Sequence, residues 1–407
     1  MVENYSKNIT KLDYLVAFLF MAFSGNPVFI YTTEWYAVIS LTIMLVLCFL
    51  NHKQCIGGKI SRLLAIFILL SVLQYFFLEN VSIPADINQI AKIYAAFLFT
   101  SFLGTKFRES YLRVITVLAA ISLPFWFARF LSENVTFGFE VDRYYSIIIF
   151  NTTQNINYNY SSFVRNCGMF WEPGAYSGFL LLVPLVYINN LKELYINNKK
   201  SCVILLAALL STGSTTGYIV LIFLVGSMLL KNIQNPIVRL LFLIIVVALG
   251  SYAFIGLDFL GAKIISEYES ASELSQGQSS WTRMGAMQID LENILRHPFI
   301  GNGYLLQSRY GALGELMGGT GNGFTGAINI YGIPIMLIYL CMLSKNIPVV
   351  SNRTKFIAVF AVILLLNGEY HLNYSAFWAL LFIQYDSEKK YRYIDETKNS
   401  RIINSFQ

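Results

Sequence analysis

The chain has 407 residues, of which 56% are hydrophobic and only 13% are charged, whereas about a quarter of the residues in a soluble domain are charged. Apolar runs of membrane-spanning length recur from one end to the other, which excludes an array of soluble domains. The net charge of +6 comes mainly from short loops between these runs. It therefore indicates orientation in a membrane and not a nucleic-acid partner.

The apolar runs predict an all-α polytopic protein with about twelve transmembrane helices, in a single membrane domain covering residues 1–407. The first span is interrupted by Gly25-Asn26-Pro27. The seventh ends in a polar stretch, residues 211–217, whose backbone needs protein or water around it at membrane depth. The spans are expected at residues 13–31, 34–50, 62–78, 88–104, 113–130, 174–190, 202–213, 215–230, 238–256, 325–343, 356–369 and 372–386.

Basic residues orient these spans. Most of the 29 Lys and Arg residues fall in every second loop, which places both chain termini in the cytoplasm. No cleavable signal pattern is present at the N-terminus. The five cysteines are odd in number and lack a C-x-x-C spacing, so neither a disulfide framework nor a metal site is expected. Two long segments, residues 131–173 and 257–324, then lie on the outer side, where we expect the chemistry.

The second outer segment contains a predicted helix, which Ser279 or Ser280 can cap and which His297-Pro298 ends. Its apolar stripe favours packing on the membrane face or on the other spans over a ligand groove. The stripe consists of Trp281, Met284, Met287, Leu291, Ile294 and Leu295.

The cations expected on the outer side are mainly arginines, which oppose the orientation signal and need another explanation. A guanidinium binds phosphate through a bidentate fork, and lipid-linked sugars carry a pyrophosphate at the membrane surface. The alternative is a set of ordinary salt bridges to Glu140, Asp142, Glu172 or Asp290, or anchoring at the interface. The arginines are Arg129, Arg143, Arg165, Arg283, Arg296 and Arg309.

The first outer segment is rich in tyrosine and asparagine. Tyrosine offers an apolar face with a polar tip, and amides both donate and accept hydrogen bonds, a mixture that suits a saccharide. The alternative is a polar loop that only covers the outer side. The residues are Tyr144, Tyr145, Tyr158 and Tyr160, with Asn151, Asn155, Asn157 and Asn159.

Glu172 stands where this segment re-enters the membrane, between Trp171 and Pro173. Partial desolvation of a carboxylate favours its neutral form and makes the ionised form a better base. The alternative is that Glu172 pairs with Arg165 or another cation and shapes the loop. Nucleophile patterns such as G-x-S-x-G are absent, and the three histidines have no metal-ligand spacing.

Three segments resemble the superfamily of Wzy polymerases and O-antigen ligases, which are GT-C-like membrane glycosyltransferases. A fourth stretch, Ser214-Thr-Thr-Gly217, is similar to the family's Ser-Arg-Thr-Gly, with Thr215 where Arg is common. The three segments are residues 165–179 with their Arg–Gly–Phe–Glu–Pro run, residues 283–304 with Arg283, Asp290 and His297-Pro298-Phe-Ile-Gly301-Asn-Gly303-Tyr304, and Asn322-Gly323-Phe324 followed by Tyr331-Gly332.

This resemblance implies about twelve helices with a large outer loop over a lateral cavity. It also implies two arginines that hold the donor pyrophosphate, which we place at Arg165 and Arg283. Ligases typically carry a His directly before the Asn-Gly-Phe-like segment. Gly321 stands there in this chain, which favours a polymerase over a ligase.

The predicted function is polymerisation of undecaprenyl-pyrophosphate-linked oligosaccharides into O-antigen or a related surface polysaccharide, at the periplasmic face of a bacterial inner membrane. The expected partners are the lipid-linked oligosaccharide, membrane lipid and a chain-length regulator protein, with no metal, cofactor or nucleotide sugar. An O-antigen ligase that acts on lipid A-core and a transporter of the same lipid-linked unit are the alternatives. The predicted catalytic residues are Arg165, Arg283 and Glu172, and the predicted substrate-binding residues are Arg143, Tyr144, Tyr145, Tyr158, Tyr160, Trp171, His297, Tyr304, Arg309 and Asn322.

Overall fold

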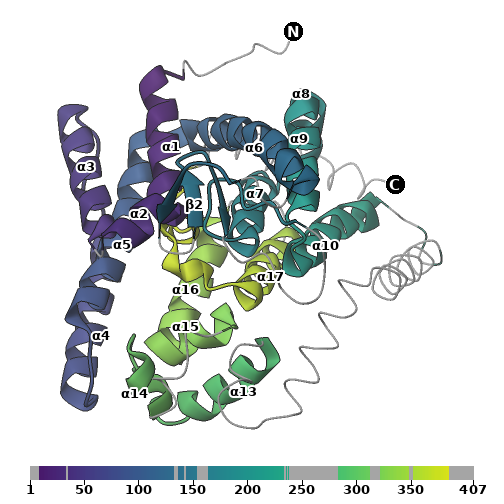
Figure 1. Ribbon diagram of the computed structural model, residues 1–407. Coiled ribbons are helices and arrows are strands. Elements are labelled where there is room, and N and C mark those ends of the chain that lie inside the picture. Colours follow the sequence, from purple (N-terminus) through teal and green to yellow (C-terminus); the bar gives the residue numbers. More distant parts are fainter. Residues whose placement is uncertain are drawn as a thin grey trace, which may run out of the picture.

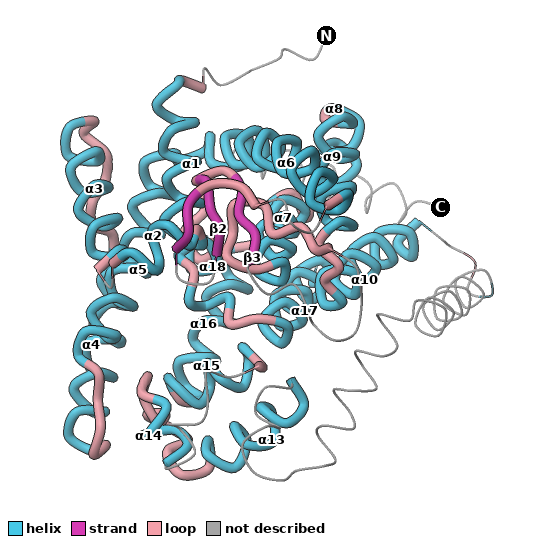
Figure 2. Tube along the Cα trace, viewed as in Figure 1, coloured by secondary structure: helices cyan, strands magenta, loops and turns pink. Residues whose placement is uncertain are grey.

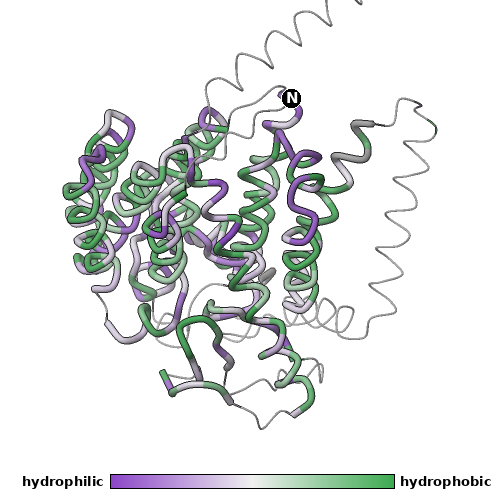
Figure 3. Tube along the Cα trace, turned by 90° about the horizontal axis from the view of Figure 1, so that it is seen from above, coloured by the Kyte–Doolittle hydropathy of each residue, from purple (hydrophilic) through white to green (hydrophobic). Residues whose placement is uncertain are grey.

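The computed structural model describes residues 9–33, 35–132, 136–141, 144–153, 164–232, 235, 237, 283–311, 321–347 and 352–384. These residues are mostly helical (Figure 1). Most helical residues are also hydrophobic (Figure 3), in agreement with the apolar runs of the sequence. The predicted helical class is therefore confirmed for the described part of the chain, with one small sheet added.

The helices of the first third of the chain follow the predicted spans. Three of them end directly before Asn26, Asn51 or Gly104, because Asn and Gly favour turns and helix ends. The helices are α1 (Lys11–Gly25), α2 (Pro27–Thr32), α3 (Tyr36–Leu50), α4 (Gly58–Phe77), α5 (Ile83–Leu103), the short 3-10 helix η1 (Gly104–Lys106) and α6 (Phe107–Leu131).

The predicted interruption of the first span is confirmed at Asn26. Asn26 ends α1 and caps α2, since its Oδ1 accepts a hydrogen bond from Val28 N at 3.0 Å. Pro27 occupies the first position of α2, where its missing N–H costs no helical hydrogen bond. The Asn26 Nδ2 donates a hydrogen bond to Met169 O at 2.6 Å. The residue at the helix break is therefore also attached to the first outer segment.

The remaining helices depart from the predicted spans in two places. The span expected at 325–343 is broken at Gly332, which has φ +82°, and the span expected at 372–386 contains only short helices in its described part. The span expected at 238–256 lies outside the described residues. The helices are α7 (Pro173–Val186), α8 (Leu191–Asn197), α9 (Lys199–Ser211), α10 (Thr215–Asn232), α13 (Arg283–Ile294), α14 (Leu306–Tyr310), α15 (Gly323–Tyr331), α16 (Ile333–Asn346), α17 (Asn352–Gly368), the 3-10 helix η4 (His371–Asn373) and α18 (Ser375–Ala379).

Two helical stretches in the described residues are long and apolar enough to cross a membrane, namely Gly58–Phe77 and Ile83–Leu131. The number rises to four if each of two bent pairs is one span. These pairs are α7 with α8, bent by 104°, and α15 with α16, bent by 118°. The count is below the predicted twelve, because several apolar helices are short or broken.

A three-stranded antiparallel sheet lies in the first outer segment (Figure 2). Its strands are β1 (Phe139–Val141), β2 (Tyr144–Ile147) and β3 (Phe150–Thr153), in the order β1-β2-β3. Aromatic and β-branched residues favour such strands. The sheet departs from the predicted all-α class, because cross-strand pairing is invisible in a search for apolar spans.

The helix α13 confirms the helix predicted in the second outer segment, and only part of its apolar stripe is buried in the protein. Ile294 is buried, whereas Leu291 and Leu295 are 50% and 79% exposed. The buried face instead carries Asp290 and Asn293, and it packs on α15. Buried polar side chains therefore take part in the packing of α13 on α15, beside which it lies in Figure 1.

Candidate functional site

Arg165 lies at the polar break between α9 and α10. Its Nε donates a hydrogen bond to Thr212 O at 2.9 Å, and the side chain is half-buried. Gly213 turns the chain with φ +58°, and Ser214 Oγ accepts a hydrogen bond from Gly217 N at 3.2 Å. Protein groups thus satisfy the break in the way predicted from its polar sequence.

Asn166 anchors the segment that carries Arg165. This side chain is fully buried, and its Nδ2 donates to Ser122 Oγ at 3.0 Å and to Ser211 Oγ at 2.9 Å. Its Oδ1 accepts a hydrogen bond from Gly168 N at 2.9 Å. Because α6 and α9 supply these serines, both helices together determine where the neighbouring guanidinium lies.

Trp171 and Glu172 lie at the start of α7, next to Tyr374. The Trp171 Nε1 donates a hydrogen bond to the Tyr374 hydroxyl. Glu172 is the residue directly before α7. A second carboxylate, that of Glu369, lies against Gly174 at the start of the same helix. An indole, a phenol and two carboxylates therefore share one region.

Glu369 is a site residue that the sequence analysis missed. Its carboxylate covers Gly174, where an added β-carbon would overlap it. The Glu369 carbonyl packs against Gly323 in the same manner, and the preceding Gly368 packs against Thr216. The end of α17 therefore contacts the starts of α7, α10 and α15. The available signal was a lone carboxylate at the end of the apolar run 356–369.

Asn322 is placed beside this junction, as the cap of α15. Its Oδ1 accepts hydrogen bonds from Phe324 N at 3.0 Å and from Thr325 N at 3.1 Å. Its Nδ2 donates to Asn367 Oδ1 at 3.2 Å. The predicted substrate-binding residue thus also has a local structural role, because asparagine is among the preferred residues at this position.

Three helix starts meeting at one place have an electrostatic consequence. The free N–H groups and the dipole at the N-terminus of a helix favour negative charge, and such positions bind phosphate in many proteins. Here the starts of α7, α10 and α15 meet at the end of α17, and Arg165 is bound to the loop that leads into α10. The region suits an anionic group.

A second polar cluster joins the outer segment to the helices below it. Asp290 of α13 is fully buried and accepts hydrogen bonds from Tyr310 at 2.6 Å, Thr325 at 2.7 Å and Asn329 at 2.8 Å. Asn302 extends the network by donating to Asn329 Oδ1 at 2.7 Å. Burial raises the pKa of the Asp290 carboxyl, and the three donors oppose this shift.

A row of tyrosines connects this cluster with Glu369. The Tyr304 hydroxyl donates to Tyr331 Oη at 2.9 Å, and the Tyr331 and Tyr370 hydroxyls are 2.6 Å apart. The guanidinium of Arg309 donates through Nη2 to Tyr304 O at 3.0 Å and is largely buried. Two predicted residues, Tyr304 and Arg309, therefore lie along a path that ends next to Glu369.

For the other predicted residues, the structure describes the side chain, the backbone alone, or neither. His297 is half-buried after α13, and its carbonyl accepts a hydrogen bond from Gly301 N at 2.8 Å. Tyr145 is half-buried in β2. Arg283 begins α13 and Tyr144 begins β2, but their side chains lie outside the described part. Three predicted residues lie wholly outside the described residues: Arg143, Tyr158 and Tyr160.

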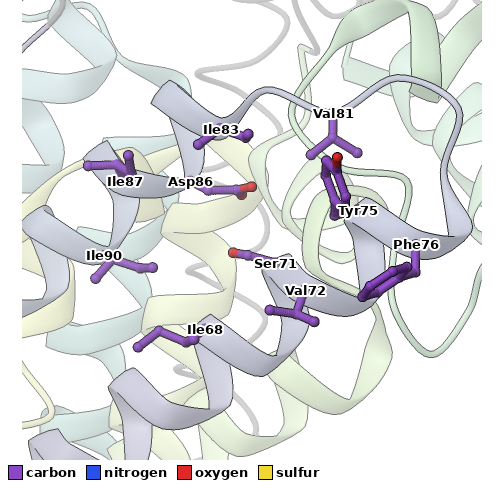
Figure 4. A pocket seen from close by; sticks show the side chains of 10 residues that line it. All are labelled: Ile68, Ser71, Val72, Tyr75, Phe76, Val81, Ile83, Asp86, Ile87 and Ile90. Atoms are coloured by element: carbon purple, nitrogen blue, oxygen red, sulfur yellow. The ribbon is translucent and has the colours of Figure 1, made fainter.

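A mostly apolar groove of about 290 Å³ lies between α4 and α5. Asp86 and Ser71 face each other in it, as the close-up in Figure 4 shows. The apolar lining suits a hydrocarbon, and the exposed side chains on its rim suit a membrane. The remaining lining residues are Ile68, Val72, Tyr75, Phe76, Val81, Ile83, Ile87 and Ile90.

Among the residues that the structure describes, no group of three or more His, Cys, Asp or Glu side chains is placed to hold a metal ion. No protein-family model matches the chain, and no curated protein matches it. The functional conclusion therefore depends on the geometry and on the sequence resemblance.

Proposed function

We propose that this protein polymerises undecaprenyl-pyrophosphate-linked oligosaccharide repeats into O-antigen or a related surface polysaccharide. The reaction is a glycosyl transfer that releases undecaprenyl pyrophosphate at the outer face of a bacterial inner membrane. In this proposal the chain crosses the membrane about twelve times, counting apolar runs that lie outside the described residues or in short helices, with both termini in the cytoplasm. The apolar helices with spanning length, Gly58–Phe77 and Ile83–Leu131, support the membrane setting.

The observation that carries this proposal is the position of Arg165 beside three converging helix starts. Its guanidinium is tied to Thr212 O, and the starts of α7, α10 and α15 meet around the end of α17. Both features favour an anion, and a guanidinium binds phosphate oxygens through a fork of N–H groups. A departing pyrophosphate is the anion that the resemblance to Wzy polymerases implies.

The arginines stabilise the charge that develops on the leaving group. Arg165 and Arg283 hold the pyrophosphate, with Arg143 and Arg309 as additional cations. Removal of one such donor typically costs about 10²–10³ in rate. The reaction needs no nucleotide sugar, because the donor sugar arrives already activated by its pyrophosphate. It needs no metal, because the arginines supply the positive charge that neutralises the leaving group.

The acceptor is the non-reducing sugar of a second lipid-linked repeat. Trp171, with Tyr145 of β2, presents aromatic faces to its rings. Tyr144, the neighbour of Tyr145 in the sequence, is assigned the same role. Tyr158 and Tyr160 belong to the same outer segment and share this role. Glu172 contributes negative charge near the acceptor hydroxyl. A chain-length regulator protein sets the number of repeats.

Purified protein incubated with lipid-linked repeats, with products sized on a gel, tests the proposal. The wild type should give a ladder, and Arg165→Lys and Arg283→Lys should insert normally but make no long product. Lysine keeps the charge but lacks the bidentate fork. The matched control is Arg353→Lys, at an exposed position of α17, which should give a wild-type ladder. Full ladders from both site variants would refute the assignment.

Cells from which the gene for this protein has been deleted distinguish the proposed polymerase from its two rivals, a ligase and a transporter. A single repeat on lipid A-core supports a polymerase, whereas lipid A-core without any repeat supports a ligase. Repeats that accumulate on the cytoplasmic side of the membrane support a transporter. The helix breaks at Asn26 and Gly332 are the features that a transporter would share.

A further inference from the structure

Glu369 occupies an electrostatically unfavourable position on its own helix. It directly follows Gly368, the last residue of α17, and the C-terminal end of a helix disfavours negative charge. The starts of α7 and α15 compensate, because Gly174 and Gly323 lie against this residue. Tertiary packing thus holds the carboxylate at a position where the dipole of its own helix destabilises negative charge.

The surroundings of Glu369 suit a sugar ring. Its carboxylate lies against Gly174 at the start of α7. Glu172 directly precedes that helix and follows Trp171, whose indole donates a hydrogen bond to the Tyr374 hydroxyl. Saccharides have apolar faces that pack on aromatic rings and hydroxyls that donate to carboxylates. Trp171 is half-buried, whereas Tyr374 is buried, so the Trp171 ring and the two carboxylates supply these two kinds of contact.

The same residue lies next to the region that suits an anion. Gly368 contacts Thr216, in the first turn of α10, and Arg165 is bound to the loop before that helix. An acceptor hydroxyl and a leaving pyrophosphate must lie on either side of one anomeric carbon. Glu369 therefore stands where these two sites meet.

We propose that Glu369 binds the acceptor sugar and takes the proton of its attacking hydroxyl, an inference that rests on the proposed polymerase function. The hydroxyl oxygen forms a bond to the anomeric carbon of the donor sugar. The bond from that carbon to the pyrophosphate breaks, and its electron pair leaves with the pyrophosphate. The proton moves to the Glu369 carboxylate and from there to solvent. Glu172 then orients the acceptor.

A double-variant cycle tests the geometry. Gly174→Ala should lower the midpoint of thermal unfolding, because the new β-carbon overlaps the Glu369 carboxylate. Combining it with Glu369→Ala should restore most of that loss, whereas Glu369→Gln, which keeps the size of the side chain, should not. Equal midpoints for the two double variants would overturn the placement of Glu369.

Kinetics with lipid-linked repeats test the chemical role. Glu369→Gln should lower kcat by about 10²–10⁴, the usual contribution of a general base, while binding of undecaprenyl pyrophosphate stays at the wild-type level. Glu369→Asp should regain part of the rate, with a shifted acidic limb of the pH–rate profile. The control is Glu292→Gln, at an exposed site on α13, which should match the wild type.

The outcomes separate the two proposals. A polymerising wild type with a Glu369→Gln variant of nearly equal kcat overturns only the role of Glu369. A Glu369→Gln variant that loses undecaprenyl pyrophosphate binding and thermal stability together also overturns it, because the residue would then be structural. A folded wild type that forms no polymer from lipid-linked repeats overturns both proposals.

Discussion

Asp290 and Thr325 are joined by a hydrogen bond of 2.7 Å between the threonine hydroxyl and the aspartate carboxylate, both of them buried. Asp290 belongs to the outer helix α13, and Thr325 to the first turn of α15. The contact therefore attaches the second outer segment to the helix that Asn322 caps beside Glu369. The strength of this attachment determines how firmly the outer segment is held over the site.

Removal of the Asp290 carboxylate should loosen α13. In Asp290→Ala, Tyr310, Thr325 and Asn329 lose their acceptor, and each buried group left unpaired costs about 1–3 kcal/mol. We expect a loss of at least about 3 kcal/mol in the free energy of unfolding, with faster proteolysis near α13. The exposed Glu292 of the same helix provides the control, and Glu292→Ala should change stability by less than about 0.5 kcal/mol. Similar losses in both variants would contradict the network.

The stability of this attachment should depend on pH. Burial raises the pKa of Asp290 above its ordinary value, so the folded protein binds the proton more tightly than the unfolded chain. The stabilisation of the folded state by the Asp290 proton is fully present below the ordinary pKa of aspartate. It is lost as the pH rises through the raised pKa that Asp290 has in the folded protein. Thermal midpoints measured from about pH 3.5 to 8 should therefore fall more steeply in the wild type than in Asp290→Asn. Parallel curves would show that Asp290 does not titrate in this way.

Asn166 should be required for the placement of Arg165. In Asn166→Ala the buried N–H of Gly168 and the hydroxyls of Ser122 and Ser211 lose a partner, which we expect to cost about 1–3 kcal/mol. Polymer formation should fall along with stability, because the guanidinium loses its support. Asn197→Ala, at the exposed end of α8, is the control and should leave both quantities unchanged. Normal ladders from Asn166→Ala would exclude this positioning role.

Gly332 should not tolerate a side chain. Its backbone at φ +82° and ψ 164° is essentially confined to glycine, with a strain of about 1–3 kcal/mol for other residues, and a β-carbon would also overlap Phe299 O. Gly332→Ala should therefore destabilise the protein by at least that amount. In Gly226→Ala, a β-carbon meets no atom within 4 Å, and stability should rise by about 0.5–1 kcal/mol. Thermal unfolding of both variants checks the contrast.

The sequence by itself determined the mostly helical class with apolar helices of spanning length, the breaks at Asn26 and after Thr212, and the helix at 283–294. These features depend on local causes, namely apolar runs, a proline at a helix start, and capping residues a few positions away. Arg165, Glu172 and Asn322 also followed from sequence, through short motifs resembling the Wzy family. The residues that surround these three side chains could not be predicted from the sequence.

Only the tertiary structure decided which of these residues meet. The contact of Glu369 with Gly174 joins residues far apart in the chain, as do the bonds from Asn166 to Ser122 and from Asp290 to Asn329. The bend at Gly332 and the pairing of β2 with β1 and β3 likewise depend on packing. Such contacts form because buried polar groups must find partners wherever the fold offers them, and no local pattern specifies which partner lies nearest.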